Sequence, residues 1–125
     1  MKKVNIDQLD EKEEEIADAL ISLGLGRTVA RTMASLNNGN EVTSIALERR
    51  TGLRQPEVSI VMRQLKEYDW INERDEKKIG KGRPYKIYSL KVGFNDIIAH
   101  LEEQQKKEID YGLASIERLR KLVNN

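Results

Sequence analysis

The sequence TGLRQPEVSIVMRQLKE, residues 51–67, joins the end of one expected helix to the whole of the next. Gly52 is typical of a helix end, and Pro56 suits the first turn of a helix, where its missing N–H leaves no hydrogen bond unmade. Apolar residues then recur at steps of three, one and three, which places them on one helix face: Val58, Val61, Met62 and Leu65. This stretch predicts two helices joined by a tight turn, the second at about 55–68.

Three helices are expected before residue 51, at about 10–23, 27–36 and 43–50. The first begins at Asp10, which forms a capping box with Glu13. The third is capped by Thr43 or Ser44. The inward positions of these helices are predicted to be Ile16, Ala17, Leu20, Ile21, Val29, Ala30, Met33, Leu36, Ile45 and Ala46. The acidic run Glu13–Glu15 is interpreted as a solvated face near the positive end of the helix dipole.

A β-hairpin is expected directly after the helix at 55–68. Residues 70–74 and 85–90 have the composition of short strands, the second with partial alternation of apolar and polar residues. The loop between them is basic and rich in glycine, and Lys77–Lys86 holds five cations and no acid. Helices followed by such a hairpin predict an α+β, mainly α-helical fold, a winged helix-turn-helix.

The chain is expected to end in one long helix from about Phe94 to Val123. A seam of residues at steps of three or four predicts a homodimer through this helix: Ile98, Leu101, Gln105, Ile109, Gly112, Ile116, Leu119 and Val123. The alternative is an amphipathic helix that packs back on its own domain. We therefore divide the chain into a DNA-binding domain at 1–92 and a dimerisation helix at 93–125.

Composition excludes several functional classes. The sequence has no Cys and one His, His100, which removes disulfides, thiolate zinc sites and most His-based catalytic sets. No run of about 18 apolar residues and no signal sequence occurs, so we expect a cytoplasmic protein with no membrane partner. We expect no enzymatic activity, no cofactor and no metal. An effector molecule is left open.

Positive charge is concentrated in the middle of the chain, although the net charge is only +1. Residues 54–91 contain 10 Lys+Arg against 6 Asp+Glu, whereas residues 1–23 contain 3 against 7. This asymmetry favours a polyanionic partner over a solvated charged loop.

The helix at 55–68 is narrow enough for the major groove of double-stranded DNA, and the basic loop could reach a neighbouring backbone or minor groove. The candidate DNA contacts are Arg54, Gln55, Pro56, Ser59, Ile60, Arg63, Lys81, Arg83 and Lys86. Gln55 and Arg63 suit adenine and guanine edges. Ile60 suits a thymine methyl group, with packing into the core as its alternative.

These motifs resemble archaeal transcription regulators of the broad ArsR, MarR and TrmB-like group. The resemblance covers roughly three quarters of the chain and rests on residues 51–67, on the wing-like GRPYKIYSL at 82–90 and on LGLGR at 23–27. It implies a dimer that binds operator DNA, usually to repress transcription. The sugar-binding domain of full-length TrmB-like regulators and the cysteine boxes of ArsR metal sensors have no counterpart here.

A second hypothesis from another class is a protein-interaction module. In it, the winged helix docks a protein partner and the last helix serves assembly. The five cations of Lys77–Lys86 without a compensating acid favour DNA over this alternative.

Overall fold

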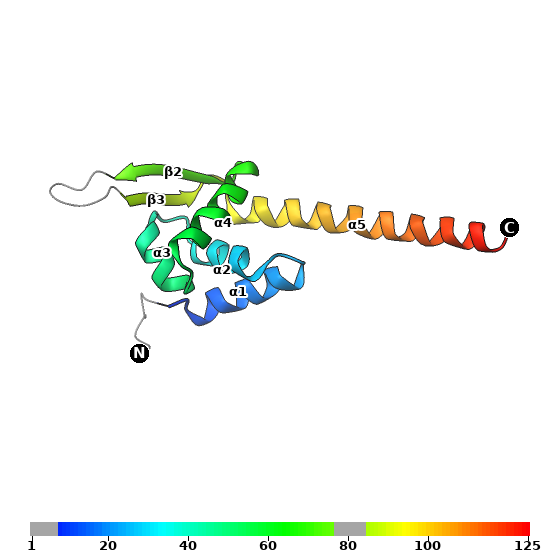
Figure 1. Ribbon diagram of the computed structural model, residues 1–125, viewed down its shortest axis with the longest axis horizontal. Helices are drawn as coiled ribbons and strands as arrows, with labels where there is room; N and C mark the ends of the chain where they lie inside the picture. Colours follow the sequence, from blue (N-terminus) through cyan, green and yellow to red (C-terminus); the bar gives the residue numbers. More distant parts are fainter. Residues whose placement is uncertain (1–7, 77–84) are drawn as a thin grey trace. The chain divides into compact units, whose positions relative to one another are not determined.

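A computed structural model describes residues 8–76 and 85–125 of the chain (Figure 1). Its elements are α1 (Glu11–Ser22), α2 (Arg27–Ser35), β1 (Val42–Thr43), α3 (Ser44–Thr51), α4 (Gln55–Glu67), β2 (Ile71–Glu76), β3 (Tyr85–Leu90) and α5 (Phe94–Val123). The fold class predicted from the sequence, a mainly helical α+β winged helix with a long C-terminal helix, is confirmed. The chain divides into two compact units after Phe94.

The helix ends follow from local side-chain chemistry. Asp10 accepts a hydrogen bond from the Glu13 N–H at 2.7 Å, and the Glu13 carboxylate accepts from the Asp10 N–H at 2.9 Å, so the expected capping box is present. Thr43 caps α3 through the Ala46 N–H at 3.0 Å. Gly52 ends α3 in the left-handed region at φ 76°, which glycine adopts without the steric cost of a Cβ atom.

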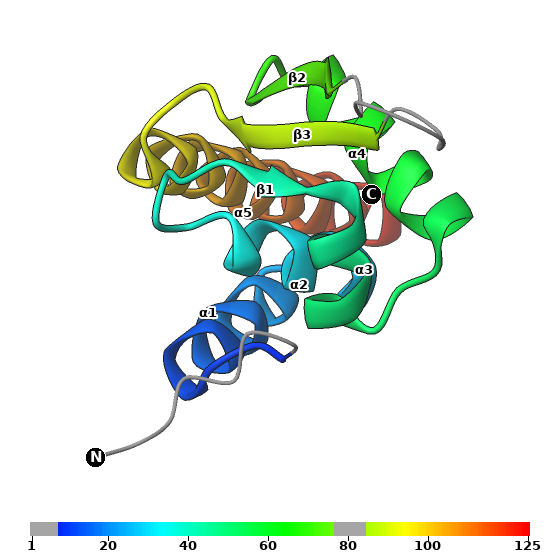
Figure 2. The same cartoon turned by 90° about the vertical axis from the view of Figure 1, so that its left-hand side faces the viewer.

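The sheet has three antiparallel strands in the order β1-β3-β2, as Figure 2 shows. The β2–β3 hairpin pairs Ile71 with Leu90, and β1 adds Val42 opposite Tyr88 on the other edge of β3. The range of β3 is the one expected, while β2 extends beyond the expected end at residue 74. Sequence reasoning missed β1, because a strand of two residues has no periodicity to detect.

The core draws its side chains from α1 to α4 and from the sheet, and it confirms the apolar stripe of α4, whose four residues are nearly fully buried. Two expected core positions are wrong: Ile45 is 46% exposed and Ile21 is 40% exposed. In α3 the inward side chain is Leu47, and Ile45 lies about 200° around the helix from it. In α1 the buried face is Glu13, Ala17 and Leu20, which leaves Ile21 at its edge.

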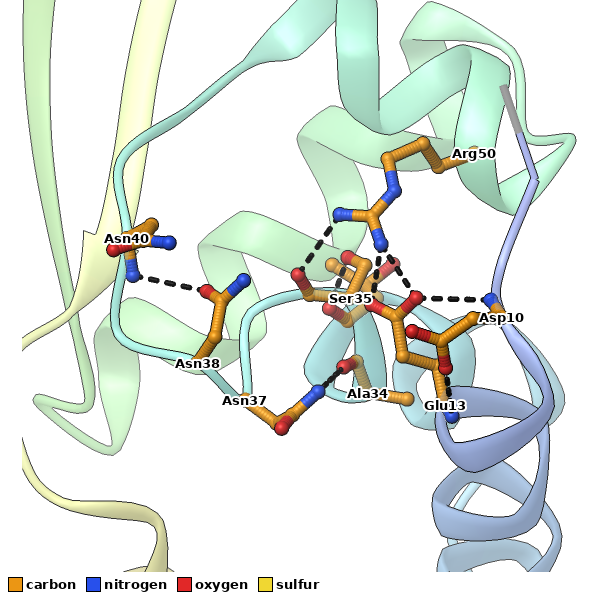
Figure 3. Close-up of polar contacts among 9 residues, drawn as sticks. Asp10, Glu13, Ala34, Ser35, Asn37, Asn38, Asn40 and Arg50 are labelled. Carbon is orange, nitrogen blue, oxygen red and sulfur yellow. Dashed lines mark hydrogen bonds and ion pairs between the residues drawn. The ribbon is translucent and has the colours of Figure 1, made fainter. Parts of the chain in front are cut away.

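Two arginines connect α1 to the helices that follow through ion pairs with acidic residues of α1. Figure 3 shows the Arg50 guanidinium between the Glu13 carboxylate, with which it forms an ion pair, and the Ser35 carbonyl, to which it donates at 3.3 Å. Arg31 pairs with Glu14 at 2.8 Å. The interpretation of Glu13–Glu15 as a solvated face is therefore wrong for Glu13, which is buried. Glu14 is half exposed and also pairs with Arg31.

Helix α5 forms most of the second unit and carries a row of exposed apolar side chains. Ile109, Ile116, Leu119 and Val123 of the predicted seam are 53%, 54%, 60% and 73% exposed. Its polar side has ion pairs one turn apart, including Glu102 with Lys106 at 3.2 Å. Within the described residues, no helix has an apolar segment sufficient to span a bilayer.

Candidate nucleic-acid interface

Helix α4 has an exposed face directly opposite the face that it buries in the core. At about 100° per residue, Val58, Val61, Met62 and Leu65 share one side of the helix. The centre of the opposite side then falls on Pro56, Ile60, Arg63 and Glu67, with Ser59 and Gln64 at its two edges, and all six are exposed. A rigid, half-buried helix thus presents these side chains together.

The start of α4 is fixed by the backbone of the turn before it. The Arg54 N–H donates to the Glu57 carboxylate at 3.2 Å, and Pro56 occupies the first turn, as expected. This arrangement leaves the side chains of Arg54 and Gln55 exposed at the helix N-terminus. The N-terminal end of a helix also favours anions such as phosphate, because its backbone N–H groups point outward.

All of the sequence-predicted DNA contacts that the structure describes are exposed: Arg54, Gln55, Pro56, Ser59, Ile60, Arg63 and Lys86. Ile60 is 55% exposed, so its alternative role in the core is wrong. The other two candidates, Lys81 and Arg83, lie outside the described residues. Glu67 also lies on the exposed face of α4, but it was not among the residues predicted from the sequence to contact DNA.

The cations of α4 and of the hairpin differ in their partners. Across residues 8–76 and 85–125, no carboxylate pairs with the side chain of Arg54 or Arg63. Both guanidinium groups are therefore available to an external anion. The planar guanidinium group of arginine forms bidentate hydrogen bonds to phosphate and to a guanine edge.

The strands of the hairpin, in contrast, neutralise their own cations. Lys86 on β3 lies 3.2 Å from Asp75 and 3.5 Å from Glu73 on β2. The hydrogen bond to Asp75 and the charge of Glu73 raise the pKa of Lys86. Arg74 on β2 is also paired, at 2.5 Å from Glu76 of the same strand and at 2.8 Å from Glu41, which precedes β1.

Sequence reasoning missed this compensation because it counted charges along the chain. The acids that pair with Lys86 lie on the facing strand, where Asp75 is directly opposite Lys86 in the register. Aligning the two expected strands of the hairpin in antiparallel register would have placed Asp75 opposite Lys86 and predicted this pair. Lys86 therefore has a compensating acid, contrary to the prediction from the sequence for Lys77–Lys86.

The described residues contain no group of three or more His, Asp or Glu side chains placed to hold a metal ion. His100 lies on α5, near Gln104, whose side-chain nitrogen is 3.3 Å from its ring.

Solved structures provide the comparison for this geometry, since no protein-family model and no curated protein matches the sequence. A possible transcriptional regulator from Methanosarcina mazei matches with a TM-score of 0.56 at 18% identity, over 82% of this chain and 86% of that one. The multiple antibiotic resistance repressor MarR matches with a TM-score of 0.50 at 15% identity, over 90% and 86%. The chain has a winged-helix fold, as these solved structures do. At these identities the likeness establishes the fold alone, and the narrower archaeal, ArsR or TrmB-like grouping stays a prediction.

Proposed function

We propose that this protein is a sequence-specific, double-stranded DNA-binding transcription regulator that is not an enzyme. The observation that carries the proposal is the exposed face of α4, which presents Arg63 and, at its N-terminus, Arg54. Neither guanidinium group pairs with a carboxylate of the residues that the structure describes. The structural neighbours are transcriptional regulators with the same fold, which supports the same conclusion.

In the proposed complex, α4 lies in the major groove. Its N-terminal residues are nearest the base edges in helix-turn-helix docking, which gives Gln55 an adenine edge. Arg63, about two turns further along the same helix, takes a guanine edge. Ile60 lies beside them to meet a thymine methyl group, and Ser59 binds phosphate. Lys81 and Arg83 of the sequence-predicted wing bind the backbone or the minor groove.

We infer a homodimer, formed through the seam of α5, that reads two half-sites about one turn of DNA apart. A single winged helix covers only a short site, so dimerisation doubles the sequence that is read. Repression of transcription in the cytoplasm is the proposed outcome, since occupation of an operator blocks other proteins from the same DNA.

The proposal predicts a steep dependence of DNA affinity on salt. If a dimer neutralises about six phosphates, a plot of log K against log salt should have a slope near −5. Fluorescence anisotropy with a labelled duplex, measured across a series of salt concentrations, gives this slope. A slope close to zero, or no binding to duplex DNA at low salt, would contradict the proposed function.

Substitutions should separate residues that read bases from residues that bind the backbone. Arg63→Ala should weaken binding to the preferred site by about 1–3 kcal/mol and relax discrimination at one base pair, because the bidentate contact is lost. Arg83→Ala should weaken all sequences evenly. The measurement is binding to a panel of single-base variants of a site selected from random duplexes.

Lys12→Ala on α1 is the control, since it removes one exposed positive charge from a helix outside the proposed DNA-binding surface and should change binding little. Equal losses on every variant duplex for Arg63→Ala would assign Arg63 to the DNA backbone.

The compensated charge of the hairpin strands favours one alternative, a protein-interaction module. Lys86 and Arg74 have acidic partners within the chain, as surface residues of a protein-docking domain do. The salt series distinguishes the two functions, because a protein-docking domain displaces no condensed counterions from DNA.

A further inference from the structure

Glu73 is the centre of an ion-pair network that joins α4 to the hairpin. Its Oε2 atom lies 2.8 Å from the Lys66 Nζ of α4 and 3.5 Å from the Lys86 Nζ of β3. The Glu73 side chain is 20% exposed, whereas the lysine side chains are about half exposed. One carboxylate on β2 thus holds two cations that come from different elements.

The ionic state of this network is well defined at neutral pH. The hydrogen bond from Lys66, followed by the charges of Lys66 and Lys86, lowers the pKa of Glu73 against the opposing effect of desolvation. Glu73 is therefore fully ionised. With Asp75, it balances the charges of the two lysines.

The network lies next to the proposed reading face of α4. Lys66 follows Arg63 by three residues, so the two side chains are neighbours on successive turns. A DNA phosphate that reached Lys66 would compete with the Glu73 carboxylate for the same ammonium group, and the negative charge of Glu73 would also repel it. Arg63 has no carboxylate partner among the described residues, so a phosphate that reaches it meets no such competitor.

We propose that Glu73 competes with DNA phosphates for Lys66 and Lys86, and so limits how strongly the protein binds DNA of any sequence. This inference rests on the proposed DNA-binding function. Sequence-independent affinity comes almost entirely from phosphate contacts, and genomic DNA offers a large excess of such sites. Occupying two lysines within the chain keeps this affinity low, while the base-reading residues of α4 are untouched.

The test uses the full-length protein and a fluorescein-labelled duplex of random sequence. For Glu73→Gln we expect roughly tenfold tighter binding at about 100 mM salt and a slope of log K against log salt steeper by about 1 to 2, because released lysines neutralise further phosphates. Gln keeps an acceptor oxygen beside Tyr88, whose pKa is raised by burial first and then by Glu73. Circular dichroism checks that the fold is retained.

A net-charge control is Glu15→Gln, an exposed acid of α1. Helix α1 lies on the opposite side of the first unit from the hairpin (Figures 1 and 2), so this change should alter the affinity by less than about twofold through screened charge alone. Asp75→Asn is a second variant that acts through Lys86, and it should shift affinity in the same direction as Glu73→Gln.

A double-mutant cycle with Lys66→Met separates competition from general electrostatics. In the original protein Lys66 contacts Glu73, so Lys66→Met should change DNA affinity by less than about twofold. In the Glu73→Gln background, the same substitution should reverse most of the gain. Equal effects in both backgrounds, or a Glu73→Gln variant that matches Glu15→Gln, would overturn the competition while leaving DNA binding intact. Absence of any duplex binding by the original protein would overturn the proposed function itself.

Discussion

Replacing Arg50 by Met should lower the free energy of unfolding by about 3–5 kcal/mol, because the buried Glu13 carboxylate then loses its ion-pair partner. The Glu13 side chain is 4% exposed, and its carboxylate is held by Arg50 and by the Asp10 N–H. Without Arg50, the Asp10 N–H is the one remaining donor to the negatively charged Glu13 carboxylate among the contacts described. The Ser35 carbonyl loses a donor as well. Such a change is a large fraction of the stability of a small domain.

Urea unfolding at one fixed protein concentration measures this effect, since the stability of a dimer depends on concentration. Arg49→Met is the matched control: the neighbouring arginine of α3 is exposed, so its replacement should stay within about 0.5 kcal/mol. The double variant Glu13→Leu with Arg50→Met should recover most of the loss, because an apolar pair replaces the ion pair. A loss for Arg50→Met no greater than for Arg49→Met would contradict the proposed burial cost.

The parts of the fold that could be predicted from sequence are those fixed by near neighbours along the chain. The capping box of Asp10 and the start of α4 at Pro56 depend on groups within one helical turn. The stripe from Val58 to Leu65 repeats over two turns, so its period alone identified the buried face of α4. The exposed face, which holds most of the candidate site, then followed by geometry.

The features that sequence reasoning missed depend on partners far away in the chain. Glu13 is buried because Arg50, 37 residues later, reaches it, and nothing in the run Glu13–Glu15 indicates this. Lys86 is neutralised by Asp75, 11 residues earlier, once the hairpin sets the strand register. A count of charges along the chain therefore overestimates the cations free to bind DNA, and only tertiary pairing corrects it.

Placing two acids in the α5 seam, as Ile109→Glu with Ile116→Glu, should convert the expected dimer into a monomer. These residues are seven apart, so they repeat one position of the seam, and both are exposed in the single chain. In a dimer each carboxylate would be buried without a partner. Loss of the second DNA-binding domain should then reduce affinity for a two-fold symmetric site by about 10²–10⁴-fold, since both half-sites no longer bind as one unit. Light scattering at tens of micromolar protein and anisotropy measure the two effects.

The matched control is Tyr111→Glu with Leu122→Glu, which also adds two acids to exposed apolar positions of α5. Tyr111 and Leu122 lie about 100–120° around the helix from the centre of the seam, so these changes should leave a dimer intact. They carry the same added charge and a similar change in helix propensity, which isolates the seam as the variable. A dimer that survives the seam substitutions, or one that the control dissociates equally, would show that another surface joins the two chains. A monomeric original protein at the same concentration would remove the assigned role of α5 altogether.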